Sequence, residues 1–111
     1  MIKIWIDDVR EAPAGYVWCK STRDALRTIV MKHKDEVCLI DLDHDAGDYA
    51  NDGGDFINVL KELERLSRTP RNKNYWGPRC KEIEFRLHSA NAVGVQNMRA
   101  IIQANGWREV R

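Results

Sequence analysis

Residues 37–43 read VCLIDLD, four apolar residues in succession followed by two aspartates separated by a leucine. A continuous apolar run of this length is typical of a strand buried on both faces, in the centre of a parallel sheet. We therefore expect residues 37–43 to form a central strand with Asp43 at its carboxyl end. Ligands of open parallel sheets bind just beyond that end of the strands.

Two further runs end in polar clusters. Residues 2–6, IKIWI, alternate as a strand does and are followed by Asp7-Asp8. Residues 84–87, EFRL, are followed by His88-Ser89-Ala90-Asn91. Because the carboxyl ends of parallel strands lie at one edge of the sheet, we expect these three clusters to converge.

The rest of the chain alternates strands with helices. We expect a short strand at 16–19, a helix from Ser21 or Thr22 to about 33, a helix after the polar loop 46–54, a helix at 92–104 and an edge strand at 107–110. Loops are expected at 8–15 and 69–79, which contain proline and glycine. This order predicts right-handed crossovers and one α/β domain over residues 1–111, a three-layer sandwich with a mostly parallel sheet of four or five strands.

The bulk composition is that of an ordinary globular domain. The chain has 111 residues, 43% of them hydrophobic and 32% charged, and a net charge of +1, which argues against general coating of nucleic acid. Three widely spaced cysteines, Cys19, Cys38 and Cys80, fit reduced thiols in the cytoplasm. The apolar start is too short for a signal peptide, and no stretch approaches the roughly 20 apolar residues of a membrane span.

Asp7, Asp8 and Asp43 form the candidate metal site. Three carboxylates at one sheet edge repel one another, and a divalent cation such as Mg²⁺ or Mn²⁺ relieves the repulsion. The alternative is a set of helix caps and solvated loop acids. Asp41, one pleat period before Asp43, is expected to be a deeper structural acid, and Asp45 either ligates the cation or orients His44.

The three motifs resemble the site of response-regulator receiver domains, with the flavodoxin-like strand order 2-1-3-4-5. An acidic pair ends the first strand, an aspartate the third, and a hydroxyl residue followed by alanine the fourth. By that resemblance Asp7 and Asp8 are metal ligands, Asp43 matches the phosphoacceptor and Ser89 the residue that contacts phosphate.

The chain departs from ordinary receivers at two points. No lysine ends the fifth strand, where the sequence reads Trp107-Arg108-Glu109, and histidines replace apolar residues at 44 and 88. The motifs DDVR at 7–10, LDHD at 42–45 and HSAN at 88–91 are more similar to the cyclic-phosphate-processing receiver family. That resemblance implies action on a cyclic phosphate.

His44 and His88 are the candidate proton-transfer residues, with Asp43 as the third catalytic candidate. Opening a cyclic phosphate requires a base for water and an acid for the leaving alkoxide, and imidazoles can do both near neutral pH. The alternative is that either histidine only hydrogen-bonds an aspartate or ligates a metal.

Arg10, Ser89 and Asn91 are the candidate phosphate-binding residues. Ser89 and Asn91 precede a helix whose free N–H groups could hold an anion, although helix capping alone would explain them. Arg10 could pair with a phosphate from the first loop.

A basic stretch at 68–81 contains five Lys or Arg residues and no acid, with Tyr75 and Trp76 among them. Because it joins a helix to the next strand, we expect it at the amino ends of the strands, away from the aspartates. There it would be a solvated loop or a partner surface.

The leading hypothesis is a metal-dependent phosphoesterase that acts on a cyclic phosphate, with a cyclic nucleotide or an RNA end as the small phosphorylated ligand. A second hypothesis is a receiver-like module that binds such a ligand or a protein partner without turnover. A third, a phosphorelay receiver, is disfavoured by the missing lysine.

Overall fold

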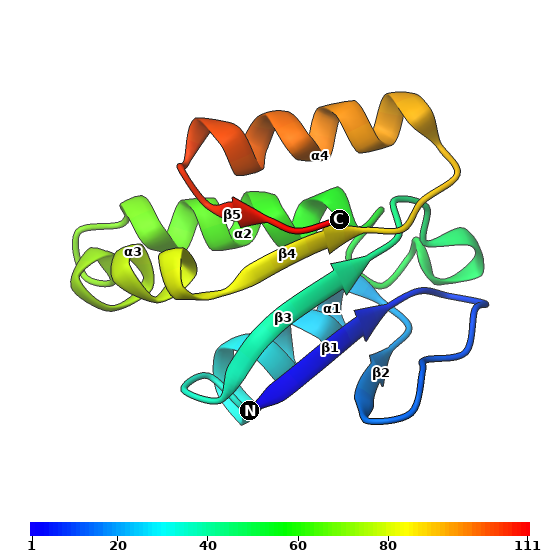
Figure 1. Cartoon of the computed structure of the whole chain (residues 1–111), viewed down its shortest axis with the longest axis horizontal. Helices are drawn as coiled ribbons and strands as arrows, with labels where there is room; N and C mark the ends of the chain where they lie inside the picture. Colours follow the sequence, from blue (N-terminus) through cyan, green and yellow to red (C-terminus); the bar gives the residue numbers. More distant parts are fainter.

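The computed structural model describes all residues from 1 to 111. The strands are β1 (Ile2–Ile6), β2 (Tyr16–Cys19), β3 (Val37–Leu42), β4 (Glu84–Leu87) and β5 (Arg108–Glu109). The helices are α1 (Thr22–Leu26), continued by a π-helical segment η1 (Arg27–Lys32), a short 3₁₀ turn η2 (Gly47–Tyr49), α2 (Ile57–Arg68), α3 (Lys73–Glu82) and α4 (Ala92–Ala104). Figure 1 shows their arrangement.

All five strands are parallel and lie in the order β2-β1-β3-β4-β5. The expected α/β class, the parallel sheet and the receiver-like strand order are confirmed. The central strand is β3, whose Ile40 and Leu42 are fully buried, as are Ile4 and Ile6 of β1 and Phe85 of β4. These five side chains face the helices and form the centre of the core.

The helices cover one face of the sheet only. The crossovers from β2 to β3, β3 to β4 and β4 to β5 all step in the same direction, and right-handed crossovers in one direction place their helices on one side. In agreement, α2 packs against both α1 and α4. Figure 1 shows no helix over the near face of β1, β3 and β4.

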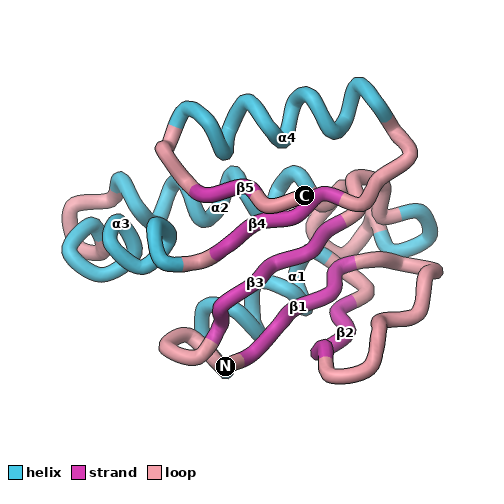
Figure 2. The backbone as a smooth tube through the Cα atoms, viewed as in Figure 1, coloured by secondary structure: helices cyan, strands magenta, loops and turns pink.

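The expected third layer is therefore absent from this chain. The step from β1 to β2 runs in the opposite direction and would place a helix on the other face, but residues 7–15 form a loop (Figure 2). No helix follows β5 within the 111 residues. The domain has two layers because the only connection able to build the third contains no helix.

The segment 69–79, expected as a loop, is largely helical because α3 begins at Lys73. Burial outweighs the effect of its internal Pro78: Trp76 is 5% exposed, Cys80 is fully buried, and the Arg79 guanidinium donates to the carbonyls of Lys34 and Val37. The segment lies at the amino ends of the strands, away from the aspartates, as expected (Figure 1). None of the helices combines the length and apolar character needed to cross a membrane.

Helix starts follow their capping residues. The Ser21 hydroxyl caps α1 by accepting a hydrogen bond from the N–H of Asp24, and the side-chain Oδ1 of Asn91 accepts from the N–H of Gly94 at the start of α4. Both helices begin where the sequence predicts, and each cap fixes the chain entering the helix from a strand end.

Candidate functional site

Asp7, Asp8 and Asp43 converge at the carboxyl ends of β1 and β3. One oxygen of each lies within 4.8 Å of the others. The sequence predicts this convergence, because β1 and β3 are neighbours in a parallel sheet. Three carboxylates at this separation form an oxygen donor set of the kind that hard divalent cations prefer.

The carboxylate of Asp7 is completely buried and fixed on both oxygens. Oδ1 accepts hydrogen bonds from the N–H groups of Val9, at 3.0 Å, and Arg10, at 2.9 Å, while Oδ2 lies 2.9 Å from Nε2 of His88. Burial alone would raise the pKa of Asp7, but the backbone hydrogen bonds and His88 outweigh it and lower that pKa. Asp7 is therefore held as a carboxylate in one orientation.

Asp8 has the opposite electrostatics. Burial, and then the charges of Asp7 and Asp43, raise the pKa of Asp8 above its ordinary value. Gly47 closes over this side chain: at φ +55° it approaches so near that a Cβ would lie 2.2 Å from Oδ2 of Asp8. A cation would offset the repulsion that raises the pKa of Asp8, so the donor set and its electrostatics both fit a divalent ion.

Asp43 is 9% exposed, and its Oδ1 accepts a hydrogen bond of 2.8 Å from the N–H of His44. The Asp43 carboxylate lies beside those of Asp7 and Asp8 where the chain leaves β3. The other oxygen has no hydrogen bond within the protein and remains available to a ligand.

His88 is clamped between two acids. Nδ1 lies 2.7 Å from Oδ1 of Asp41 and Nε2 lies 2.9 Å from Oδ2 of Asp7, while the ring stacks on Trp5 with 3.8 Å between centroids. Burial lowers the pKa of His88, but the hydrogen bonds to Asp41 and Asp7 outweigh it and raise that pKa. Asp41, 2% exposed, thus acts as the structural acid that the sequence predicts, and its contact is His88.

His44 has a freer environment. Its Nδ1 lies 2.9 Å from Oδ1 of Asp45, and no protein group bonds its Nε2. The ring lies directly beneath Gly94 of α4, where a Cβ would come within 2.4 Å of its Cγ. The hydrogen bond from His44 is the first cause that lowers the pKa of Asp45. This contact fits the role of orienting His44, and ligation of a cation by Asp45, the other role left open above, stays a prediction.

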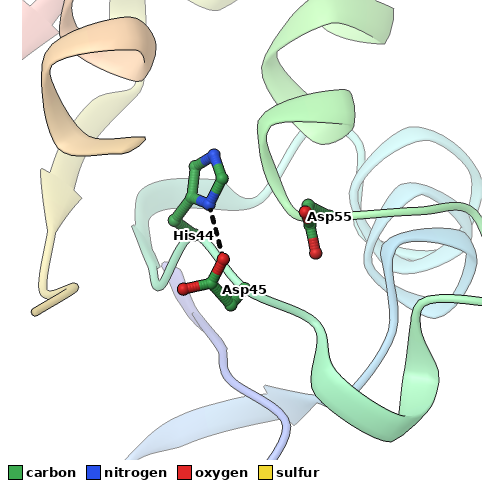
Figure 3. A group of neighbouring side chains, drawn as sticks. All are labelled: His44, Asp45 and Asp55. Carbon is green, nitrogen blue, oxygen red and sulfur yellow. Dashed lines mark hydrogen bonds and ion pairs between the residues drawn. The ribbon is translucent and has the colours of Figure 1, made fainter. Parts of the chain in front are cut away.

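Asp55 completes a second group that the sequence does not predict. His44, Asp45 and Asp55 offer ligand atoms within 4.8 Å of one another (Figure 3). Asp55 lies in the turn before α2, and its Oδ1 accepts a hydrogen bond of 3.0 Å from the N–H of Ala46. The only sequence signal is an aspartate near a helix start, which is too common to single it out.

The three candidate phosphate-binding residues make hydrogen bonds within the protein at this edge of the sheet. The Arg10 guanidinium donates to the carbonyl of His88 at 2.8 Å, and the Ser89 hydroxyl accepts from the N–H of Asn91 at 3.1 Å. Asn91 caps α4, and its amide nitrogen lies 3.3 Å from Asp45. Capping is thus one role of Asn91, and phosphate contact by these three residues stays a prediction.

Comparison with known families gives one match. Residues 2–104 match the profile of a family described as the cyclic-phosphate processing receiver domain. No curated protein and no solved structure matches the chain.

Proposed function

This chain belongs to the cyclic-phosphate processing receiver domain family, and from that premise we propose that it is a metal-dependent phosphoesterase that opens or hydrolyses a cyclic phosphate. The substrate would be a cyclic nucleotide or an RNA end. The observation that carries the proposal is the convergence of Asp7, Asp8 and Asp43 beside two histidines at one sheet edge.

Asp7, Asp8 and Asp43 would hold Mg²⁺ or Mn²⁺. The ion would supply Lewis-acid polarisation of the phosphoryl group and offset the negative charge that develops on it. Asp7 is oriented for ligation by its backbone hydrogen bonds, and Asp8 is the acid whose environment is most improved by a cation.

Hydrolysis adds water to phosphorus and breaks one of the two ring P–O bonds, so one proton must leave the water and one must reach the leaving alkoxide. His44 is the better placed of the two histidines for direct transfer, because its Nε2 is unbonded while Asp45 holds Nδ1. His88 can exchange a proton only when its bond to Asp7 or Asp41 opens. When His88 is protonated, its positive charge also offsets the negative charges of Asp7 and Asp41.

Arg10, Ser89 and Asn91 would bind the phosphate group. Arg10 is half exposed on its side chain and reaches the site from the loop after β1, whereas Ser89 and Asn91 lie between β4 and α4. The N-terminal N–H groups of α4 would add donors for the anion. We also place the domain in the cytoplasm, a proposal supported by its three unpaired cysteines.

The test is turnover of 2′,3′-cyclic and 3′,5′-cyclic nucleotides and of RNA with a cyclic phosphate end, in Mg²⁺ or Mn²⁺. His44→Ala is expected to lower kcat roughly 10²–10⁴-fold with little change in KM, because it removes a proton-transfer group. His33→Ala, at the C-cap of η1 before the amino end of β3, is the matched control and should keep full activity.

Turnover unaffected by His44→Ala and His88→Ala would reduce both histidines to structural residues. Binding of a cyclic phosphate without consumption of any member of the panel would instead favour a binding module. That second function has one observation in its favour: the clamp on His88 leaves neither of its nitrogens free.

A further inference from the structure

The face of the sheet that no helix covers carries a defined set of outward side chains, here called the open face. Strand register places them in rows across the sheet, because residues two apart share a face. They are Lys3 and Trp5 of β1, Tyr16 and Trp18 of β2 with Lys20 beyond it, Leu39 and Asp41 of β3, Glu84 and Arg86 of β4, and Arg108 of β5.

Three aromatic rings lie together on the open face. Trp5 and Tyr16 make an edge contact with 6.0 Å between centroids, and Trp18 lies beside Trp5 on the neighbouring strand. All three are partly exposed, whereas the other two tryptophans, Trp76 and Trp107, are 5% and 7% exposed in the core. Residues 16 and 18 are separated by about 6.6 Å along the strand, so each ring can contact a separate planar group.

Cations accompany the rings. The ammonium group of Lys3 lies 5.4 Å from the centre of the Tyr16 ring, and that of Lys20 lies 4.5 Å from the Trp18 ring. Both lysines are exposed, and neither has a carboxylate partner.

Arg86 and Arg108 carry the positive charge further across the sheet. Arg86 lies 3.7 Å from Asp41, and its Nε–H is a buried donor without a partner. Arg108 is 3.7 Å from Glu84. The open face thus carries four basic side chains, those of Lys3, Lys20, Arg86 and Arg108, and two acidic ones, those of Asp41 and Glu84. It therefore has an excess of positive charge.

The open face continues into the acidic site. The Trp18 indole N–H donates to the backbone carbonyl of Asp7 at 2.8 Å, and Trp5 stacks on His88, which bonds Asp7. A ligand lying on these rings would therefore have its end at the carboxylates.

We propose that the open face binds single-stranded RNA whose cyclic phosphate terminus lies at the acidic site. The proposal rests on the proposed function and names its substrate class as a polymer rather than a free nucleotide. Bases stack on partly exposed aromatic rings of a sheet, and lysine and arginine neutralise the backbone phosphates. A nucleic acid can end in a cyclic phosphate only when a ribose 2′-hydroxyl is present to close the ring, which makes the polymer RNA.

The charge pattern also selects this occupant over a second protein. Lysine is depleted at protein interfaces, whereas here Lys3 and Lys20 lie over the Tyr16 and Trp18 rings. An anionic polymer with planar bases complements both features.

The experiment measures binding of a fluorescent single-stranded RNA octamer with a 3′-hydroxyl by anisotropy at low salt, so that the readout does not depend on catalysis. The charge reversal Lys3→Glu/Lys20→Glu is expected to weaken binding at least tenfold, and Tyr16→Ala roughly five- to hundredfold. The matched control Lys61→Glu/Lys81→Glu changes two exposed lysines on α2 and α3 and should bind as the wild type does. Trp5 and Trp18, the accessible tryptophans, should lose fluorescence on binding.

A separate arm follows hydrolysis of a cyclic mononucleotide by the same variants, which should be unchanged in Lys3→Glu/Lys20→Glu. If mononucleotide is hydrolysed while the octamer does not bind, the open-face proposal is wrong and the proposed function stands. If the octamer binds with the expected variant pattern and no cyclic phosphate is consumed, the RNA surface stands and the phosphoesterase fails. Equal affinity for duplex RNA, or a dimer that excludes RNA and is lost in the charge reversal, would overturn the proposal.

Discussion

At the scale of single residues, the three site carboxylates are not equivalent. Asp7 is fully buried and yet has a lowered pKa, because backbone N–H groups and His88 stabilise its charge. At Asp8 a backbone hydrogen bond lowers the pKa, but burial and the charges of Asp7 and Asp43 outweigh it and raise that pKa. Of these two acids, Asp8 is the one whose negative charge is disfavoured by its surroundings. Replacing Asp8 should therefore change the stability of the protein and its ion binding in opposite directions.

Asp8→Asn is expected to stabilise the protein in EDTA by about 0.5–2 kcal/mol, because it removes a charge that burial and then the charges of Asp7 and Asp43 disfavour. The same change should abolish the rise in Tm that Mg²⁺ or Mn²⁺ produces in the wild type by binding the folded state. Thermal unfolding with and without each ion measures both effects. Asp48→Asn, an exposed aspartate of η2, is the control and should retain the metal response. A variant that is destabilised in EDTA, or that keeps the full metal response, would contradict this account of Asp8.

Gly94 is the residue on which the position of His44 depends. Gly94→Ala would place a methyl group 2.4 Å from Cγ of His44, so either the ring or α4 must move. Overpacking of this kind costs roughly 1–3 kcal/mol, which exceeds the helix propensity gained from alanine. We expect lower stability in urea and lower turnover.

Gly77→Ala in α3 is the matched control, because the added Cβ would meet nothing nearer than 3.7 Å. This variant should gain about 0.5–1 kcal/mol of unfolding free energy from the higher helix propensity of alanine. A Gly94→Ala protein as stable and as active as the wild type would show that His44 does not need this close contact.

At the scale of elements, α4 is tied to the sheet edge by one ion pair. Nε and Nη2 of Arg99 donate to the Glu109 carboxylate of β5 at 2.8 and 2.7 Å. The hydrogen bond from Arg99 is the first cause that lowers the pKa of Glu109 from its ordinary value of 4.5. Because β5 has only two residues, this pair is a main support of the edge strand.

Glu109→Gln should cost about 1–3 kcal/mol of unfolding free energy at pH 7. A carboxyl whose pKa is lowered by folding stabilises the fold above its unfolded pKa, and that contribution is lost as pH falls through the folded pKa. The difference between wild type and variant should therefore be constant above about pH 5 and shrink below pH 4.5. Urea unfolding from pH 7 to pH 3 measures it, with Glu84→Gln, a more exposed acid, as the control. A difference that persists undiminished at pH 3 would rule out the ion pair as its cause.

The elements also show what sequence reasoning can and cannot reach. β3, α2 and α4 have strong apolar periodicity and clear start or stop signals, and all three were predicted. α3 was missed because Pro78 and Gly77 are turn signals, whereas the burial of Trp76 that makes the segment helical is a tertiary effect. The convergence of Asp7 and Asp43 follows from strand order alone, but the clamp of Asp41 on His88 depends on side-chain packing across β3 and β4.

At the scale of the whole molecule, the two-layer architecture is the feature with the widest consequence. Three layers were expected because strands alternate with helices, yet residues 8–15 were correctly predicted to be a loop, and that loop is where the helix of the missing layer would lie. One face of the sheet is consequently left to Trp5, Tyr16 and Trp18, and this face leads directly to the acidic site.

The most direct test of the metal-dependent phosphoesterase is ³¹P NMR of the cyclic-phosphate panel incubated with protein and Mg²⁺ or Mn²⁺. The account predicts that the cyclic phosphodiester resonance of at least one substrate is replaced by a monoester resonance, that EDTA stops the conversion, and that Asp43→Asn does not perform it. Persistence of every cyclic resonance with metal present, or equal conversion by Asp43→Asn, would contradict it.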